Sequence, residues 1–444
     1  QGIKSLVLPS IALGFMHMAS IARTTRSSML ETIRQDYIRT VRAKGLPEKE
    51  VITRHALRNA LIPTTTVIGL QIGGMLGGSV LTESVFAWPG IGRYMIQSIQ
   101  GRDIPSVMGC IIIFALSFAV INLIVDLIYG FIDPRIKHSI SKEGKTVMSN
   151  ASAKNVNAPA DIKKKSQFVE VWKRLCRNKT AVLGLVIVAL LTLMAILSPI
   201  LIDYETQVIK TNYSEALQAP SADHWFGTDE MGRDILLRVM YGSTVSLSIG
   251  VVTVAVSLTV GLILGAAAGY FGGKTDMIIM RIMDIFLAIP GTLLAICIVA
   301  SLGNSIPNLV IAQAVSSIPT FSRVVRGAVI TARDADYVEA ARAIGAKDAT
   351  IIFHEVLPNS LAPIIVQTTL QVASVILSIA GLSFIGLGIP APRPEWGAML
   401  SGARAYIRDY SYMCLFPGLA IMTTILSLNL LGDGLRDALD PRLR

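Results

Sequence analysis

Charged residues are scarce in this chain. Asp, Glu, Lys and Arg make up 16% of its 444 residues, whereas 52% are hydrophobic. Soluble domains carry about 25% charged residues, so the composition excludes a soluble globular protein. Only helices and closed barrels satisfy backbone hydrogen bonds inside a bilayer. The sequence predicts an all-α integral membrane protein.

Cysteine and histidine are also few, with four and five residues. Cys110, Cys297 and Cys414 lie in apolar segments and Cys176 in a basic one, which provides neither a disulfide framework nor metal-ligand spacing. The histidines, at positions 17, 55, 138, 224 and 354, share no spacing. We expect no metal and no cofactor in this chain.

Ionisable residues are nearly absent from the long apolar segments. An intramembrane enzyme needs a nucleophile with an activating base, or paired acids. An ion-driven secondary transporter needs buried acids near the bilayer midplane. Both classes are therefore disfavoured, and the sequence predicts no enzymatic activity of its own.

Nine apolar windows approach or exceed the roughly 20 residues that span a bilayer. They are residues 3–22, 61–82, 107–132, 180–202, 243–269, 277–302, 304–322, 360–390 and 412–432. The sequence therefore predicts a polytopic bundle of about nine transmembrane helices.

Basic residues alternate between the connecting segments. Residues 23–58 contain nine Lys and Arg and residues 133–179 contain twelve, against two in 83–106 and one in 203–223. Loops rich in Lys and Arg stay in the cytoplasm. The net charge of +10 therefore indicates orientation in a membrane, and we expect no nucleic-acid partner.

A polar loop occurs twice, 300 residues apart, and the match extends from Arg23 and Arg323 to Pro63 and Pro363 without a gap. Its first copy reads Asp36-Tyr37-Ile38-Arg39-Thr40-Val41-Arg42-Ala43-Lys44-Gly45. Its second copy reads Asp336-Tyr337-Val338-Glu339-Ala340-Ala341-Arg342-Ala343-Ile344-Gly345. Six predicted spans separate the copies, so both face the cytoplasm and the chain is a parallel duplicated unit.

Each copy of the loop predicts two short helices that meet at Gly45 or Gly345, where a left-handed turn costs least. A short amphipathic helix follows before the next span. We expect one face of it to carry Val51, Ile52, Ala56 and Leu57, and in the second copy Ile351, Ile352, Val356 and Leu357. A surface that is repeated in register favours docking of a paired partner.

Small and charged residues predict two further contacts. Gly261, Gly265 and Gly269 lie four residues apart, which allows close helix packing in lipid. Arg281 and Asp284 stand near the start of a span, and we expect them to pair with each other or to snorkel to the interface.

The segments predict three parts: a first unit over 1–135, a cytoplasmic linker over 136–179 and a second unit over 180–444. Four apolar segments precede the second loop after the linker, but one precedes the first loop, so we expect that about three helices of the first unit are missing. Met148 is a plausible start of an independent protein, which would make the chain two joined reading frames.

The second loop, followed by Leu357-Pro358 and Pro363, resembles the EAA loop of ABC-importer permeases. Two longer stretches resemble the second permease subunit of dipeptide, oligopeptide and nickel importers: His224-Trp225-Phe226-Gly227-Thr228-Asp229-Glu230-Met231-Gly232-Arg233-Asp234, and Gly381-Leu382-Ser383-Phe384-Ile385-Gly386-Leu387-Gly388 with Pro394-Glu395-Trp396-Gly397. Thr82-Glu83-Ser84-Val85-Phe86-Ala87-Trp88-Pro89-Gly90-Ile91-Gly92 is similar to the first subunit.

The resemblance implies a type I permease bundle in a bacterial inner membrane, with coupling loops at 23–60 and 323–360 and a cytoplasmic C-terminus. Two ABC ATPase subunits would bind these loops and hold the ATP and Mg. A periplasmic or lipid-anchored solute-binding protein would meet the outer loops 203–242 and 390–411, where Trp225, Trp396 and Tyr406 are candidate anchors.

The expected ATPase-coupling residues all lie in the two loops. They are Asp36, Tyr37, Arg42, Ala43, Gly45, Asp336, Tyr337, Glu339, Ala340, Ala341 and Gly345. The first loop departs from the pattern, because it has Arg39-Thr40-Val41 where the second has Glu339-Ala340-Ala341. Two different ATPases would fit that asymmetry.

Two alternatives to an active importer remain open: an ion-driven transporter and an inactive fragment of the importer. The solute also remains open among dipeptides, oligopeptides, glutathione and nickel chelates, because the spans contain no residue set that selects one of them.

Overall fold

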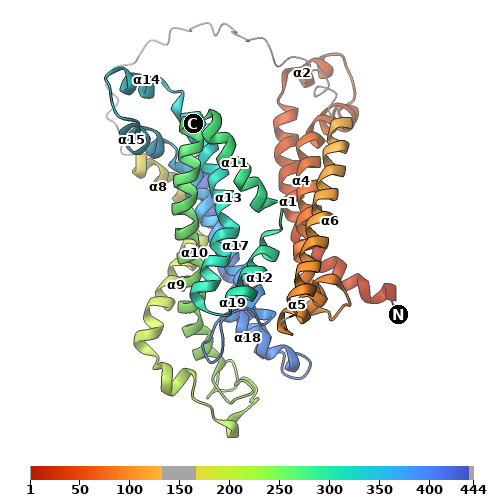
Figure 1. Cartoon of the computed structure of the whole chain (residues 1–444), viewed down its shortest axis with the longest axis vertical. Coiled ribbons are helices and arrows are strands. Elements are labelled where there is room, and N and C mark those ends of the chain that lie inside the picture. The colour runs from red at the N-terminus through yellow and green to blue at the C-terminus, as the bar shows by residue number, and fades with distance from the viewer. Residues whose placement is uncertain (1, 102, 133–166, 440–444) are drawn as a thin grey trace. The chain divides into compact units, whose positions relative to one another are not determined.

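A computed structural model describes residues 2–101, 103–132 and 167–439. The chain separates into two compact units, 1–163 with 288–290 and 164–287 with 291–444, and each is described by itself (Figure 1). The described residues are largely helical and contain no strand, apart from an isolated bridge between Thr228 and Asp234. Most of the predicted linker, including Met148, lies outside the described residues.

The first unit is a small helical bundle. Its elements are α1 (Gly2–Ile33), α2 (Asp36–Ala43), α3 (Glu48–Glu50), the π-helix η1 (Val51–Ala56), α4 (Leu57–Val85), α5 (Ile91–Gln100) and α6 (Ile104–Ile132). Helix α4 packs against α1, α5 and α6. The polar loop therefore connects the two helices α1 and α4 that lie against each other.

The second unit is larger. Its elements are α8 (Gln167–Arg177), α9 (Lys179–Leu201), η2 (Tyr204–Val208), η3 (Tyr213–Glu215), α10 (Ile235–Phe271), α11 (Gly273–Leu287), α12 (Gly291–Leu302), α13 (Ile306–Arg333), α14 (Asp336–Ala343), α15 (Asp348–Thr350), η4 (Ile351–Val356), α16 (Leu357–Asn359), α17 (Leu361–Phe384), α18 (Trp396–Ala403), η5 (Arg404–Tyr406) and α19 (Tyr412–Leu439). Helix α10 packs against α9, α13, α17 and α19 and forms the centre of this unit.

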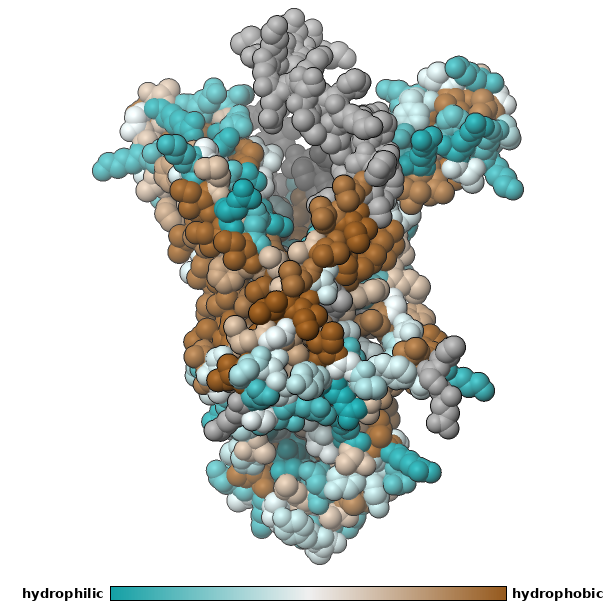
Figure 2. All heavy atoms as spheres, turned by 45° about the vertical axis from the view of Figure 1, so that its right-hand side comes forward, coloured by the Kyte–Doolittle hydropathy of each residue, from teal (hydrophilic) through white to brown (hydrophobic). Residues whose placement is uncertain are grey.

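Most of each apolar window is helical, although 360–390 runs past the end of α17 and 277–302 is divided between α11 and α12. Within the described residues, five helices are long and apolar enough to cross a membrane: α6 over 104–125, α9, α10, α17 and α19. The pair α11 and α12, bent by 80°, is a sixth candidate. Helices α1, α4 and α13 contain more polar residues. Hydrophobic side chains cover the sides of the helices and hydrophilic ones gather at the loops (Figure 2).

The glycines of α10 allow close helix packing in the second unit. A Cβ on Gly261 would lie 2.4 Å from the Cβ of Phe321, and one on Gly265 would lie 2.6 Å from the backbone oxygen of Ser322. A Cβ on Gly269 would lie 2.9 Å from the backbone oxygen of Arg326. The prediction of close helix packing is confirmed, since α13 occupies the space that larger side chains would need.

The two ends of the second unit carry different structures. Helices α14 and α15 lie at one end and α18 lies at the other (Figure 1). Helix α8 covers the C-terminal part of α19, where Leu175 packs with Ala181 and Ala438. The repeated loop and the outer-loop motifs are therefore at opposite ends of one bundle.

Candidate coupling loops

The two copies of the polar loop have the same backbone design. Helices α2 and α14 each span eight residues, α3 and α15 each span three, and the π-helices η1 and η4 each span six. Each element of the second copy begins 300 residues after its counterpart. The repeat found in the sequence is thus a repeat of local structure.

Glycine is required at the corner of each loop. Gly45 has φ +78° and Gly345 has φ +81°, in the left-handed region that other residues seldom adopt. The N–H of each glycine donates to the carbonyl of Arg42 or Arg342 at 2.9 Å, which closes the C-terminus of α2 or α14. The predicted left-handed turn is confirmed in both copies.

Three apolar anchors hold each loop. In the first loop Ile38, Val51 and Ala56 are fully buried and pack with Met29, Ile33 and Leu46, among others. In the second loop Val338, Ile351 and Val356 are at most 1% exposed. They pack with side chains of α10, α13 and α17, which are Ala266, Tyr270, Val325, Val329 and Ile364. Each loop is therefore fixed to its own helix bundle.

The predicted amphipathic face is only partly correct. Val51 and Ala56 are buried as predicted, but Ile52 is 36% exposed and Leu57 is half-buried. In the second copy Ile351 and Val356 are buried, and Ile352 and Leu357 pack against the same cluster, as predicted. A π-helix bonds residue i to residue i+5, so it places residues five apart on one face, where an α-helix would separate them.

Most of the predicted coupling residues lie on the outer surface. Of the eleven, Tyr37 and Ala341 are half-buried, and the other nine are exposed: Asp36, Arg42, Ala43, Gly45, Asp336, Tyr337, Glu339, Ala340 and Gly345. Sequence reasoning missed the anchors Ile38 and Val338. Their signal was an apolar residue at the same place in both copies.

Arg42 and Glu48 connect the two short helices of the first loop. The guanidinium of Arg42 donates to both carboxylate oxygens of Glu48, at 2.6 and 3.1 Å. This hydrogen bond lowers the pKa of Glu48 and raises the pKa of Arg42. Both groups are in contact with solvent, so the pair orders the loop more than it stabilises the fold.

Tyr270 links the second loop to α10. Its hydroxyl donates to a carboxylate oxygen of Asp348 at 2.7 Å, and the guanidinium carbon of Arg342 lies 5.2 Å from its ring centre. In the first loop, Asn59 donates to the hydroxyl of Tyr37 at 2.7 Å. A tyrosine hydroxyl therefore connects each loop to a long helix.

Ion pairs connect α13, which leads into the second loop, to α11. Arg326 donates to Asp276 at 2.6 Å, and Arg323 donates to Asp284 at 2.7 Å. The expected pairing of Arg281 with Asp284 is wrong, because α13 packs against α11 and its Arg323 pairs with that carboxylate. A displacement of the loop would therefore be transmitted to several helices.

Comparison with known proteins supports the interpretation of this geometry. Residues 1–138 and 261–444 match the family of binding-protein-dependent transport system inner membrane components. The chain belongs to this family. Residues 166–220 also match the N-terminal transmembrane domain of oligopeptide transport permease C. The protein is the transmembrane permease component of an ABC importer, a multi-pass protein of a bacterial inner membrane.

Curated relatives of this permease share half or nearly half of their residues with it. A dipeptide transport system permease protein from Alkalihalophilus pseudofirmus is 50% identical over 279 residues, 63% of this chain and 91% of that protein. A glutathione transport system permease protein from Pectobacterium atrosepticum is 44% identical over 275 residues, 62% of this chain and 91% of that protein. The Escherichia coli glutathione protein is also 44% identical, over 62% of this chain and 90% of that protein.

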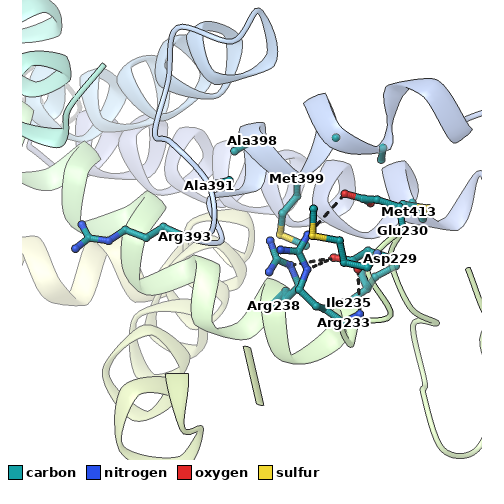
Figure 3. A pocket seen from close by; sticks show the side chains of 13 residues that line it. Asp229, Glu230, Arg233, Ile235, Arg238, Ala391, Arg393, Ala398, Met399 and Met413 are labelled. Atoms are coloured by element: carbon teal, nitrogen blue, oxygen red, sulfur yellow. Dashed lines mark hydrogen bonds and ion pairs between the residues drawn. The ribbon is translucent and has the colours of Figure 1, made fainter. Parts of the chain in front are cut away.

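The opposite end of the permease's second unit holds a small cavity of about 140 Å³ (Figure 3). Asp229 accepts from the Nε of Arg233 at 2.7 Å, and the Nε of Arg238 lies 3.5 Å from the same carboxylate. Arg238 also donates to the carbonyl of Val208 at 3.0 Å. Arg393 points away from this cluster (Figure 3). The buried charges are mutually paired, which indicates a structural brace.

Trp396 and Glu395 form part of the same cap. Trp396 is fully buried and its indole N–H donates to the carbonyl of Val239 at 3.0 Å, so the expectation that it is an outer-surface anchor is wrong. Trp225 is 70% exposed. Both carboxylate oxygens of Glu395 accept backbone N–H groups, from Gly397 and Ala398, at 2.8 Å. The Pro-Glu-Trp-Gly motif therefore begins α18 and fixes the cap.

Proposed function

We propose that this permease imports dipeptides or related short peptides. The observation that carries the proposal is the 50% identity to a dipeptide permease over 91% of that protein's length. The glutathione permeases support the same solute class, because glutathione is itself a short peptide. Nickel chelates stay an untested prediction.

Two ABC ATPase subunits bind the permease through its coupling loops, one at residues 23–60 and one at 323–360. The eleven loop residues predicted from the sequence form the contact surface. ATP and Mg are bound by the ATPases, and this chain transmits their closure to its helices. The support is structural: each loop exposes its tip and buries three anchors in the bundle behind it.

A periplasmic or lipid-anchored solute-binding protein delivers the peptide to the opposite end, where the segments 203–234 and 385–411 form the cap of the second unit. The loops, α8 and the C-terminus face the cytoplasm. The basic residues concentrated in 23–58 and 133–179 support this orientation. As the ATPases close, the helices rock and the peptide pathway opens to each side of the membrane in turn.

Uptake in proteoliposomes tests the proposal. Vesicles that contain the permease, its two ATPases and its binding protein should accumulate radiolabelled dipeptide only when ATP is enclosed. Glu339→Lys should reduce uptake at least tenfold while insertion and yield stay unchanged, because Glu339 is exposed and its loss breaks no buried contact. Asp437→Lys, the same acid-to-lysine change at an exposed position of α19 outside both loops and the cap, is the matched charge control.

Three outcomes would contradict parts of the proposal. Uptake driven by an ion gradient without ATP would indicate a secondary transporter. No uptake by the intact assembly would indicate an inactive fragment. A thermal shift of the binding protein with nickel chelate, and none with dipeptides or glutathione, would contradict the proposed solute. The proposed transport mechanism would stand.

A further inference from the structure

The tips of the two loops, residues 34–58 and 334–358, differ in charge although their backbones match. The first tip carries seven Lys and Arg against three Asp and Glu, a net charge of +4. The second tip carries two Lys and Arg against five Asp and Glu, a net charge of −3. Either set of side chains is compatible with this backbone, so the fold does not explain the difference in charge.

The reversal occurs at exposed positions that correspond in the two copies. Arg34 corresponds to Asp334 and Arg39 to Glu339, and all four side chains are exposed. Basic residues are also replaced by neutral ones, since Lys49 corresponds to Ala349. Exposed charges add little to folding stability because solvent screens them. Their main effect is on the electrostatic potential that a docking partner meets.

Pairing within each tip leaves the excess charge in place. In the first tip, Asp36, Glu48 and Glu50 each pair with an arginine of the same tip, at 3.7, 2.6 and 3.1 Å. The charges of Arg34, Lys44, Lys49 and Arg58 are not neutralised by those pairs. In the second tip, Asp348 accepts from Tyr270 and Asp334 pairs with Arg333. Arg333 precedes the tip and the hydroxyl of Tyr270 is neutral, so the charges of Asp336, Glu339, Asp348 and Glu355 still outnumber those of Arg342 and Lys347.

The second tip also exposes large apolar side chains. Ile344 is 85% exposed and Phe353 is 65% exposed, at positions where the first tip has Lys44 and Thr53. Exposed apolar residues that flank a charged rim are typical of a surface that becomes buried in a complex. The two tips therefore offer different chemistry to a partner.

We propose that the two tips recognise different partner surfaces: residues 34–58 dock on an acidic ATPase surface, and residues 334–358 on a basic one with an apolar slot for Ile344 and Phe353. This inference rests on the proposed coupling function and adds the chemistry of each contact. Opposite charges across an interface favour the correct pairing, and like charges disfavour the wrong one. The charges thus assign one ATPase surface to each loop.

Site-specific crosslinking in the native membrane tests the assignment. The photoreactive residue p-benzoylphenylalanine would replace Thr40 or Ala340, which are exposed and correspond in the two tips. Mass spectrometry would then identify the crosslinked peptides. We expect both positions to crosslink to ATP-binding subunits, at a net acidic surface from position 40 and a net basic surface from position 340.

Charge exchange provides a second, independent measurement on the intact complex in nanodiscs. Arg34→Asp with Arg39→Glu should weaken binding of the ATPase at the first loop at least tenfold at low salt, and the loss should shrink at high salt. Asp334→Arg with Glu339→Arg should do the same for the ATPase at the second loop. Arg408→Glu should affect neither ATPase.

The possible outcomes distinguish a failure of the charge assignment from a failure of the coupling role. Crosslinks from both positions to surfaces of the same charge, or salt-independent losses, would overturn the charge assignment and leave the coupling role intact. Crosslinks from both positions to lipid alone would overturn the coupling role as well.

Discussion

Gly345 shows how a single residue determines the shape of a coupling loop. Its φ of +81° is left-handed, and a Cβ at this position would meet no atom within 4 Å. The requirement for glycine is therefore one of backbone conformation and not of space. Gly327, on an exposed part of α13, also has open space around it but lies within a helix.

These two glycines make a matched pair of alanine variants. Gly345→Ala should lower the free energy of unfolding by about 1 kcal/mol, because alanine is strained at positive φ. Gly327→Ala should raise it by about 0.5–1 kcal/mol, because alanine is the better helix former. Apparent melting temperatures in detergent would compare them, and an equal response of the two variants would contradict the backbone argument.

Glu395 is a buried acid in the cap of the second unit, 1% exposed, and burial raises its pKa above the ordinary 4.5. The folded state therefore favours the neutral carboxyl, and ionisation destabilises it. The stability that the neutral group contributes is present below pH 4.5 and is lost as pH rises through the folded pKa.

Glu395→Gln should remove this pH dependence. As pH rises above 4.5, the melting temperature of the wild-type chain should fall relative to that of the variant, because glutamine cannot ionise. Parallel curves for the two proteins over that range would show that Glu395 keeps an ordinary pKa.

At the scale of elements, the contact between α10 and α13 transmits motion to the second loop. The glycines of α10 bring the two backbones close together, and α13 leads directly into α14. The π-helix η4 then places Ile351 and Val356 on the same face. A change in the spacing of α10 and α13 would therefore move the anchors of the loop.

Gly265→Ala tests the packing. The added Cβ would lie 2.6 Å from the backbone oxygen of Ser322, so the helices must separate, at a cost of about 1–3 kcal/mol. Gly418→Ala in α19 is the control, because a Cβ there meets nothing within 4 Å. Similar melting temperatures for both variants would show that α13 can shift without cost.

At the scale of the whole molecule, the orientation in the membrane decides which partners each end can meet. Cys176 is exposed on α8, and Trp225 is 70% exposed in the segment between α9 and α10. A helix that is long and apolar enough to span the membrane, α9, separates these two positions along the chain. They should therefore lie on opposite sides of the membrane.

Thiol labelling measures that orientation. In intact spheroplasts, a membrane-impermeant maleimide should label Trp225→Cys in a chain whose native cysteines are alanine. A chain that keeps Cys176 alone should be labelled only after permeabilisation. The reverse pattern would place the coupling loops outside the cell and contradict their docking to ATPases.

The amino-acid sequence by itself determined the class, the repeat and the corners of the loops. Apolar windows follow from the thickness of a bilayer, the repeat is a direct match of residues, and a left-handed corner requires glycine. These features depend on local chemistry, so the sequence predicts them without knowledge of the tertiary structure.

Tertiary structure decided the features that depend on contacts between distant residues. The π-helices η1 and η4 form where an α-helical face was predicted, and Arg323 pairs with the carboxylate of Asp284. The indole of Trp396 is buried against Val239. In each case the partner lies across a turn or in another helix, or the register follows from packing. Such contacts form only when the helices assemble. Burial and pairing with distant residues can then outweigh the local conformational preference of the chain.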